Sequence, residues 1–247
     1  MSRAPERPPL EELRRQQGDL YIVRRDLSKP VDRPTTTVRV LRVFTDDAGA
    51  SGNALGVVRA AGAIDGARRQ AIAAELGFSE TVFVDDGSRL QIFTPAAELP
   101  FAGHPLLGSA WLLRQPVLRP PAGAVSTRVD GDRAWILARP EWSPAFERRQ
   151  LDSPAAVDAL SPPPAGNLQV WAWQDEREGR IRARVFAPDF GIAEDPATGS
   201  AAIVLCAALG RALSIDQGSG CKLQARPLAD GFVELGGRVA DDGERKV

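Results

Sequence analysis

The chain has 247 residues, which is enough for one large domain or two small ones with a proper hydrophobic core. Hydrophobic residues make up 43% and charged residues 26%, as in ordinary soluble globular proteins. The net charge of −1 gives no reason to expect nucleic acid or an anionic membrane as a partner.

Residues that could support a disulfide framework, a metal site or a membrane span are scarce. The two cysteines, Cys206 and Cys221, form no CxxC pair, and one histidine cannot complete a zinc site with them, so we expect no metal. No apolar run approaches the roughly 20 residues that span a bilayer, and no signal core precedes residue 30. We therefore expect a cytoplasmic protein without a membrane partner. No nucleotide-binding glycine motif is present.

The first ordered segments follow a polar, proline-dotted N-terminal extension at residues 1–36, which we expect to be partly disordered. Strands are predicted at 38–44 and 54–58, separated by a glycine-rich turn. Asp65 then caps a helix that ends at Gly77. These elements open a first α/β half at residues 37–118.

The rest of that half is a hairpin at 81–93 and an apolar helix opened by His104-Pro105. The second α/β half, residues 119–240, follows the same order with hairpins at 125–138 and 168–186. An apolar helix opened by Asp195-Pro196 comes next, at 197–209, and a polar tail is predicted at 241–247.

An internal repeat joins the two halves. The stretch IFTPAAELPFAGHPLLGSAWLL matches VFAPDFGIAEDPATGSAAIVL in order: Phe-x-Pro, a loop, a polar residue with Pro, then Gly-Ser-Ala. The match places His104 and Asp195 at equivalent N-cap positions of two helices and indicates duplication. Helices apolar nearly all round must be buried, so each half is expected to wrap its strands around one of them.

The duplication predicts a site for a small carboxylate. A pseudo-two-fold axis would point both helix N-termini into the groove between the halves, where free N–H groups and the helix dipoles favour an anion. Gly108 and Gly199 permit close approach of the helix backbone to either a strand or a ligand. The alternative is that both ends are simply capped and solvated.

Three side chains are candidates for acid/base chemistry. Glu80 lies between Phe78 and Phe83, and a carboxyl group in apolar surroundings can hold a proton near neutral pH and return it. His104 stands at a helix start, where the dipole would lower its pKa. Asp195 is the matching position in the second half. Each also has a structural interpretation: Glu80 as a surface strand-entry residue, His104 as a core residue, and Asp195 as a helix cap.

The second half has no carboxylate that matches Glu80, because the corresponding stretch reads PPPAGNLQV. The resulting asymmetry favours moving a proton between two places on one molecule over symmetric two-base racemisation.

Four stretches together resemble the PhzF-like phenazine-biosynthesis family: VFTDDAGASGNALGVV, ELGFSETVFV, IFTPAAELPFAGHPLLGSA and RVFAPDFGIAEDPATGSAA. The resemblance runs from about Val38 to Gly237. It implies an α+β, diaminopimelate epimerase-like fold of two pseudo-symmetric halves, each a barrel-like β-sheet around a central buried helix. It also implies an isomerase that needs no metal or organic cofactor, and a homodimer.

The resemblance implies roles for individual residues. Glu80 corresponds to the family's acid/base glutamate, which takes a proton from one ring carbon of a dihydro-hydroxyanthranilate and returns it at another. His104 and Asp195 correspond to its accompanying polar groups, and the substrate-binding positions are Gly103, Thr198, Gly199 and Ser200. Cysteine-based racemisation of the related epimerases is not expected, since neither cysteine lies at a helix start.

The chain departs from the family pattern in a few places. Ala54 stands where the family usually has Pro. The segment 117–167 is short for the family, as if one edge of the second half were trimmed. The family's QG…GRP stretch is matched only in part, by Gln217-Gly218 and Arg226-Pro227. Two alternatives therefore stay open: a racemase or epimerase of the same fold, and a catalytically degenerate homologue that only binds a metabolite.

Overall fold

The computed structural model describes residues 35–247. The expected N-terminal extension therefore lies almost wholly outside the described residues. Within the described part, fifteen strands join one continuous, strongly bent sheet in the order β5-β4-β3-β2-β1-β15-β14-β13-β11-β10-β9, with β12, β6, β7 and β8 attached beside this path. No helix in the described part is long and apolar enough to cross a membrane.

The first group of elements matches the predicted order. It comprises β1 (Thr37–Thr45), β2 (Asn53–Val58), α2 (Gly66–Leu76), β3 (Glu80–Asp86), β4 (Arg89–Phe93), β5 (Glu98–Leu99) and α3 (Gly103–Leu113), with the short 3-10 turn η1 (Ala61–Ala63) before α2. Asp65 accepts a hydrogen bond from the Arg68 amide, and Gly77 ends α2 at φ 64°, so both predicted caps are confirmed.

The strands β6 (Val117–Leu118), β7 (Val125–Asp130) and β8 (Arg133–Ala138) follow α3, and β7 and β8 both contact that helix. The strands β7 and β8 come after the predicted boundary at residue 118. They nevertheless complete the set of strands around α3 that β1, β2 and β3 begin. The turn η2 (Pro140–Trp142) and β9 (Glu147–Gln150) lead onward.

The second group repeats the first. It comprises α4 (Pro154–Ala159), β10 (Leu168–Asp175), β11 (Arg180–Ala187), η3 (Pro188–Phe190), β12 (Ile192–Asp195), α5 (Gly199–Leu209), β13 (Leu213–Gln217), β14 (Cys221–Pro227) and β15 (Val233–Lys246). In each group a helix crosses between parallel strands, a hairpin follows, a short strand pairs with the hairpin, and a buried helix comes next.

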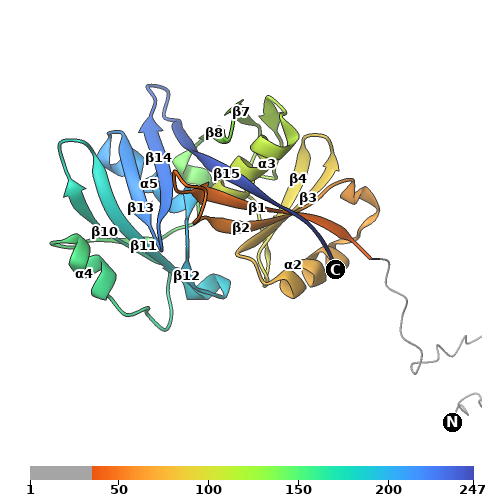
Figure 1. Cartoon of the computed structure of the whole chain (residues 1–247), viewed down its shortest axis with the longest axis horizontal. Coiled ribbons are helices and arrows are strands. Elements are labelled where there is room, and N and C mark those ends of the chain that lie inside the picture. The colour runs from red at the N-terminus through yellow and green to blue at the C-terminus, as the bar shows by residue number, and fades with distance from the viewer. Residues whose placement is uncertain (1–34) are drawn as a thin grey trace, which may run out of the picture. The chain divides into compact units, whose positions relative to one another are not determined.

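The strand β15 belongs to both groups. Its first part pairs with β14 on one side and β8 on the other, and its second part pairs with β1 through Lys246. In Figure 1 the two groups of strands lie beside each other, with β15 and β1 running between them. The segment predicted as a polar tail, residues 241–247, belongs to β15 up to Lys246: it pairs with β1, and Arg39 and Arg42 bind Asp241 and Asp242.

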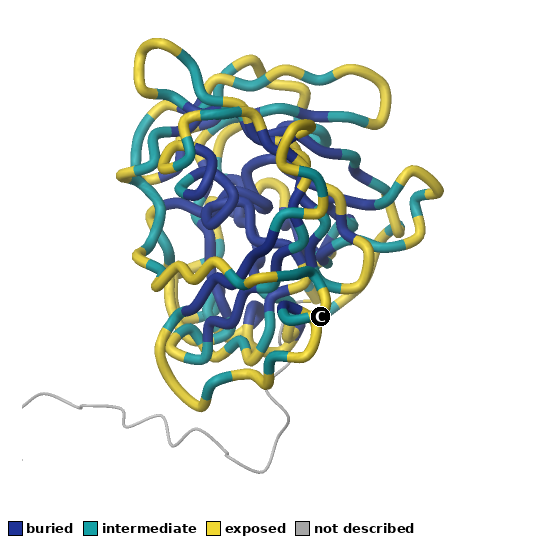
Figure 2. Tube along the Cα trace, turned by 90° about the vertical axis from the view of Figure 1, so that its left-hand side faces the viewer, coloured by how far each residue is buried: buried dark blue, intermediate teal, exposed yellow. Residues whose placement is uncertain are grey.

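Burial follows the same arrangement. Figure 2 shows buried backbone in the interior and exposed backbone in the outer loops. The largest apolar cluster unites the strands around both helices, including Leu106 and Leu107 of α3 and Ile203 and Leu205 of α5. Such burial is what the almost uniformly apolar helix sequences require.

Candidate active site

The starts of the two buried helices touch each other. Gly103 and Gly199 are the first residues of α3 and α5. A methyl group on Gly103 would lie 2.7 Å from the carbonyl carbon of Gly199, and one on Gly199 would lie 2.9 Å from that of Gly103. Only glycine allows this reciprocal contact. The predicted convergence of two helix N-termini is therefore present in the structure.

The exact helix starts differ from the prediction. His104 is the second residue of α3, whose N-cap is Ala102, and Asp195 ends β12, with Thr198 as the N-cap of α5. Asp195 pairs with Val185 of β11, so strand pairing keeps the chain extended past the position where a helix was expected. The equivalence of His104 and Asp195 is thus wrong; by the Gly103–Gly199 contact, His104 matches Ser200.

Glu80 and His104 form a buried pair. Glu80 begins β3 and is 8% exposed, and His104 is 2% exposed. Glu80 Oε2 lies 2.9 Å from His104 Nδ1, and it has no other polar partner among the described residues. The interpretation of Glu80 as a surface residue is therefore wrong. This oxygen remains available to a group that enters the site.

The electrostatic balance at His104 is opposite to the expected one. Burial by itself lowers the pKa of His104, but the neighbouring Glu80 carboxylate, together with Asp195 and the Ala54 carbonyl, raises it, and the net direction is upward. The expected downward direction of the His104 pKa is wrong, because the two nearby carboxylates outweigh the effect of burial. The pair is thus suited to hold a positive imidazolium beside a carboxylate.

Asp195 is held by a dense set of donors. Its Oδ1 accepts hydrogen bonds from Asn53 Nδ2 at 2.7 Å and Ser79 Oγ at 3.1 Å, and its Oδ2 accepts one from Thr198 Oγ1 at 2.6 Å. Burial, followed by repulsion from Glu80, raises the pKa of Asp195 to about 6, although His104 and the hydroxyl donors oppose the rise. Asp195 therefore titrates near neutral pH, a property of many active-site carboxyls.

A small cavity connects these groups. Its free volume is about 20 Å³, and its lining includes the predicted site residues Glu80, Asp195, Thr198 and Ser200. The other lining residues are mostly apolar: Thr94, Leu99, Phe101, Ala102, Pro144, Phe146, Ala187, Phe190 and Ile192. Hollows of about 410, 280 and 240 Å³ lie elsewhere on the described part, but none is lined by Glu80, His104 or Asp195.

The structure thus gathers all seven predicted site residues at one place. Glu80, Asp195, Thr198 and Ser200 line the cavity, His104 contacts Glu80, and Gly103 and Gly199 form the helix contact beside them. The three polar residues Asn53, Ser79 and Gln217, which also belong to the site, were not predicted as site residues. Their signals were present, since Asn53 ends the glycine-rich turn, Ser79 precedes Glu80, and Gln217 opens a Gln-Gly pair, but only their shared contacts identify them.

The cysteines take no part in this arrangement. Cys206 lies inside α5 and Cys221 begins β14, and burial raises the pKa of the two thiols to about 12 and about 11. Among residues 35–247, no group of three His, Cys, Asp or Glu side chains could hold a metal ion.

Comparison with known families gives a consistent match. Residues 41–130 and 150–227 match the family described as phenazine biosynthesis-like protein, PhzC-PhzF. Trans-2,3-dihydro-3-hydroxyanthranilate isomerase of Pseudomonas aeruginosa is 31% identical over 63% of this chain and 73% of its own length. The Pseudomonas fluorescens protein of the same name is 30% identical over 68% of this chain and 77% of its own length.

Solved structures agree on the fold. A PhzF-family phenazine biosynthesis protein of Enterococcus faecalis matches with a TM-score of 0.63 and 21% identity, covering 86% of this chain and 99% of that one. A hydroxyproline epimerase of Agrobacterium vitis matches with a TM-score of 0.55 and 11% identity, covering 87% and 93%. These likenesses confirm the expected epimerase-like fold.

Proposed function

Because the chain belongs to the phenazine biosynthesis-like protein family and is an isomerase of that family, we propose that it moves a proton between two carbons of a small cyclic carboxylate, with Glu80 as general acid and base. The observation that carries the proposal is the Glu80–His104 pair, whose glutamate lines the cavity beside the touching starts of α3 and α5. Glu80 Oε2 is buried, lies beside the imidazole, and has no other polar partner among the described residues.

The proton transfer balances within the substrate. Glu80 removes a proton from one ring carbon, the C–H electrons move into the substrate's double-bond system, and the protonated Glu80 returns the proton at another carbon. His104, whose pKa is raised by its two carboxylate neighbours, keeps a positive charge beside Glu80 when that side chain is ionised. No oxidation or reduction takes place.

The substrate carboxylate has a suitable partner in the helix starts. The cavity lining contains no arginine or lysine, so an anionic group would bind the backbone N–H groups at the start of α5, near Gly199 and Ser200. The aromatic walls Phe101, Phe146 and Phe190 offer flat apolar surfaces to a ring. A cavity of about 20 Å³ has room for little more than one water, so the walls must separate when substrate enters.

A second reaction of the same class is favoured by one observation. Asp195 shares the cavity with Glu80, and its pKa of about 6 lets it exchange a proton near neutral pH. Two carboxyls on one cavity could serve as opposed bases of an epimerase. Such a reaction inverts a stereocentre and leaves the double bonds in place.

The test is turnover in D₂O with trans-2,3-dihydro-3-hydroxyanthranilate and a panel of cyclic carboxylates. We expect the wild-type protein to move a double bond, and Glu80→Gln to lower kcat by at least about a hundredfold. Glu75→Gln, at an exposed position of α2, is the matched control and should keep full activity. Full activity of Glu80→Gln would remove Glu80 from the reaction, and deuterium uptake with stereochemical inversion alone would favour the epimerase.

A further inference from the structure

Gln217 is a buried residue that joins the Asp195 segment to β13. It is 1% exposed and ends β13. Its Nε2 donates to the Asp195 carbonyl at 2.9 Å and to Thr198 Oγ1 at 2.9 Å, and its Oε1 accepts from the Thr198 amide at 3.2 Å. All three hydrogen bonds go to the end of β12 and to Thr198, the N-cap of α5.

The turn that follows Gln217 is packed against the same link. Gly218 has φ 54°, and a methyl group there would lie 2.6 Å from the Pro196 carbonyl oxygen. The backbone directly after Gln217 is therefore held close to the segment that the Gln217 side chain binds. A residue without amide groups at position 217 would leave the Thr198 N–H without its partner.

The hydrogen bonds that link Gln217, Thr198 and Asp195 run in one direction. The Thr198 hydroxyl carries one hydrogen, and its oxygen already accepts from Gln217. The hydrogen is therefore free to point at Asp195 Oδ2, 2.6 Å away. This orientation makes Oδ2 an acceptor, while Asn53 donates to Oδ1. A proton on Asp195 Oδ2 would compete with the Thr198 hydrogen.

We propose that Gln217 is a positioning residue of the isomerase: by orienting the Thr198 hydroxyl, it keeps the Asp195 carboxyl in its acceptor role and so maintains the negative charge that Asp195 presents to His104. The proposal rests on the proposed function for its catalytic meaning. Its structural part, the effect on Asp195, needs no substrate.

The titratable groups that face Asp195 come from three other elements. Glu80 of β3 and His104 of α3 interact with Asp195 through their charges, and the negative charge of Asp195 also raises the pKa of Cys221 in β14. Burial raises the pKa of Cys221 to about 11, so this thiol is neutral near pH 7. The charge on Asp195 therefore acts mainly on Glu80 and on His104, whose pKa it raises.

His104 is the only histidine, so its imidazole gives a single reporter in the NMR spectrum of the untagged protein. In Gln217→Met the Thr198 hydroxyl loses its fixed direction, Asp195 holds a proton to higher pH, and the titration midpoint of His104 shifts downward. Thr198→Val should produce the same downward shift. Gln224→Met, at an exposed position of β14, should leave the midpoint unchanged.

The double variant Gln217→Met/Thr198→Val separates a positioning role from a structural one. If Gln217 acts through the Thr198 hydroxyl, the double variant shifts the midpoint no further than Thr198→Val alone. An unchanged midpoint in folded Gln217→Met, or additive shifts in the double variant, would overturn the proposal. If Gln217→Met fails to fold, Thr198→Val provides the test. An unchanged titration midpoint of His104 in that variant would overturn the proposal.

Activity measurements then connect the effect to catalysis. In Gln217→Met the acidic limb of the plot of kcat/KM against pH should move to higher pH, because Asp195 stays protonated up to a higher pH. Full activity of Glu80→Gln would contradict the proposed function. An unchanged His104 titration midpoint would contradict the role of Gln217, so the two failures are distinguishable.

Discussion

The two halves of the molecule use one scaffold for different purposes. Helices α3 and α5 each run for 11 residues, each starts with a glycine, and the two starts touch. At the second helical position the first half places His104 and the second half Ser200. The strand register sharpens the contrast: Thr81 is opposite Phe93 and Leu168 is opposite Phe186, so Asn167 stands where the first half has Glu80. Duplication thus supplies two helix starts, while only one half supplies a glutamate and a histidine.

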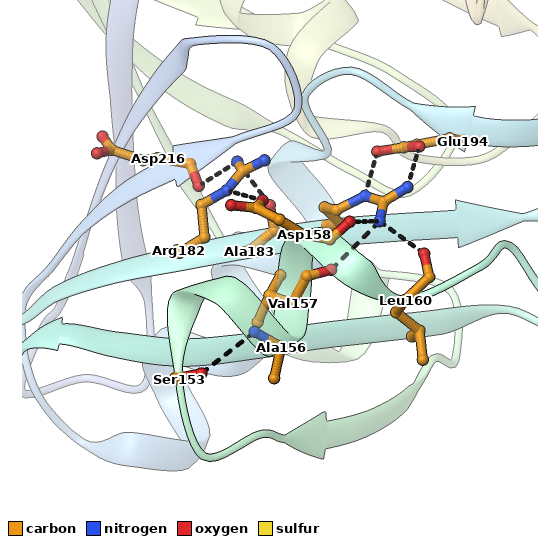
Figure 3. A network of polar contacts seen from close by, with 10 residues as sticks. Ser153, Ala156, Val157, Asp158, Leu160, Arg182, Ala183, Glu194 and Asp216 are labelled. Atoms are coloured by element: carbon orange, nitrogen blue, oxygen red, sulfur yellow. Dashed lines mark hydrogen bonds and ion pairs between the residues drawn. The ribbon is translucent and has the colours of Figure 1, made fainter.

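The crossover helices show a second difference. In the first half α2 has 11 residues, and its buried Arg69 binds Asp85 and the carbonyls of Ile64 and Ala61. In the second half α4 has only 6 residues. Arg184 of β11 donates hydrogen bonds to the carbonyls of Val157 and Leu160 at the C-terminal end of this helix. Figure 3 shows this network reaching from α4 to Glu194, the neighbour of Asp195. The short helix α4 is therefore held against β11 by an arginine of that strand.

The largest effect is expected where the halves meet. Gly103→Ala places a methyl group 2.7 Å from the backbone of α5, so one helix must move, and we expect the free energy of unfolding to fall by about 3 kcal/mol. Gly66→Ala is the matched control, because Gly66 also begins a helix but has nothing within 4 Å of an added methyl group. Urea unfolding checks both variants. Equal stability of the two would show that the contact at the helix starts is not tight.

The next effect concerns the titratable carboxyl of the second half. Because burial raises the pKa of Asp195 from 3.8 to about 6, its contribution to stability is largest below pH 3.8 and is lost as the pH rises to about 6. Asp195→Asn removes this titration. Relative to wild type, the variant should therefore gain on the order of 2 kcal/mol between pH 4 and pH 7. Denaturant midpoints across this range measure the gain, and a difference that does not change with pH would contradict it.

A smaller effect is expected at the crossover of the second half. Arg184→Met leaves Glu194 and the carbonyls of Val157, Asp158 and Leu160 without their partner, at an expected cost of about 1–2 kcal/mol. Arg149→Met, which removes an exposed pair with Glu147, should change stability by less than about 0.5 kcal/mol. Thermal unfolding compares the two. If both variants behave alike, α4 does not depend on Arg184.

Local patterns in the sequence were sufficient for much of the fold. Alternating and apolar runs identified the hairpins, Asp65 and Gly77 marked the ends of α2, and uniform apolarity predicted the burial of α3 and α5. These features depend on interactions between residues close in the chain or on burial itself, so a single sequence contains them. Glu80, His104 and Asp195 were found as candidates in the same way, by residue type and motif.

Tertiary structure alone decided how those candidates relate to one another. The pairing of Asp195 with β11 moved the start of α5 to Gly199, and this overturned the equivalence of His104 with Asp195 that the repeat predicted. The upward direction of the His104 pKa and the contacts of Gln217 likewise depend on carboxylates and donors far away in sequence. Charge and hydrogen-bond direction depend on distances in space, and these exist only after strands from both halves have come together.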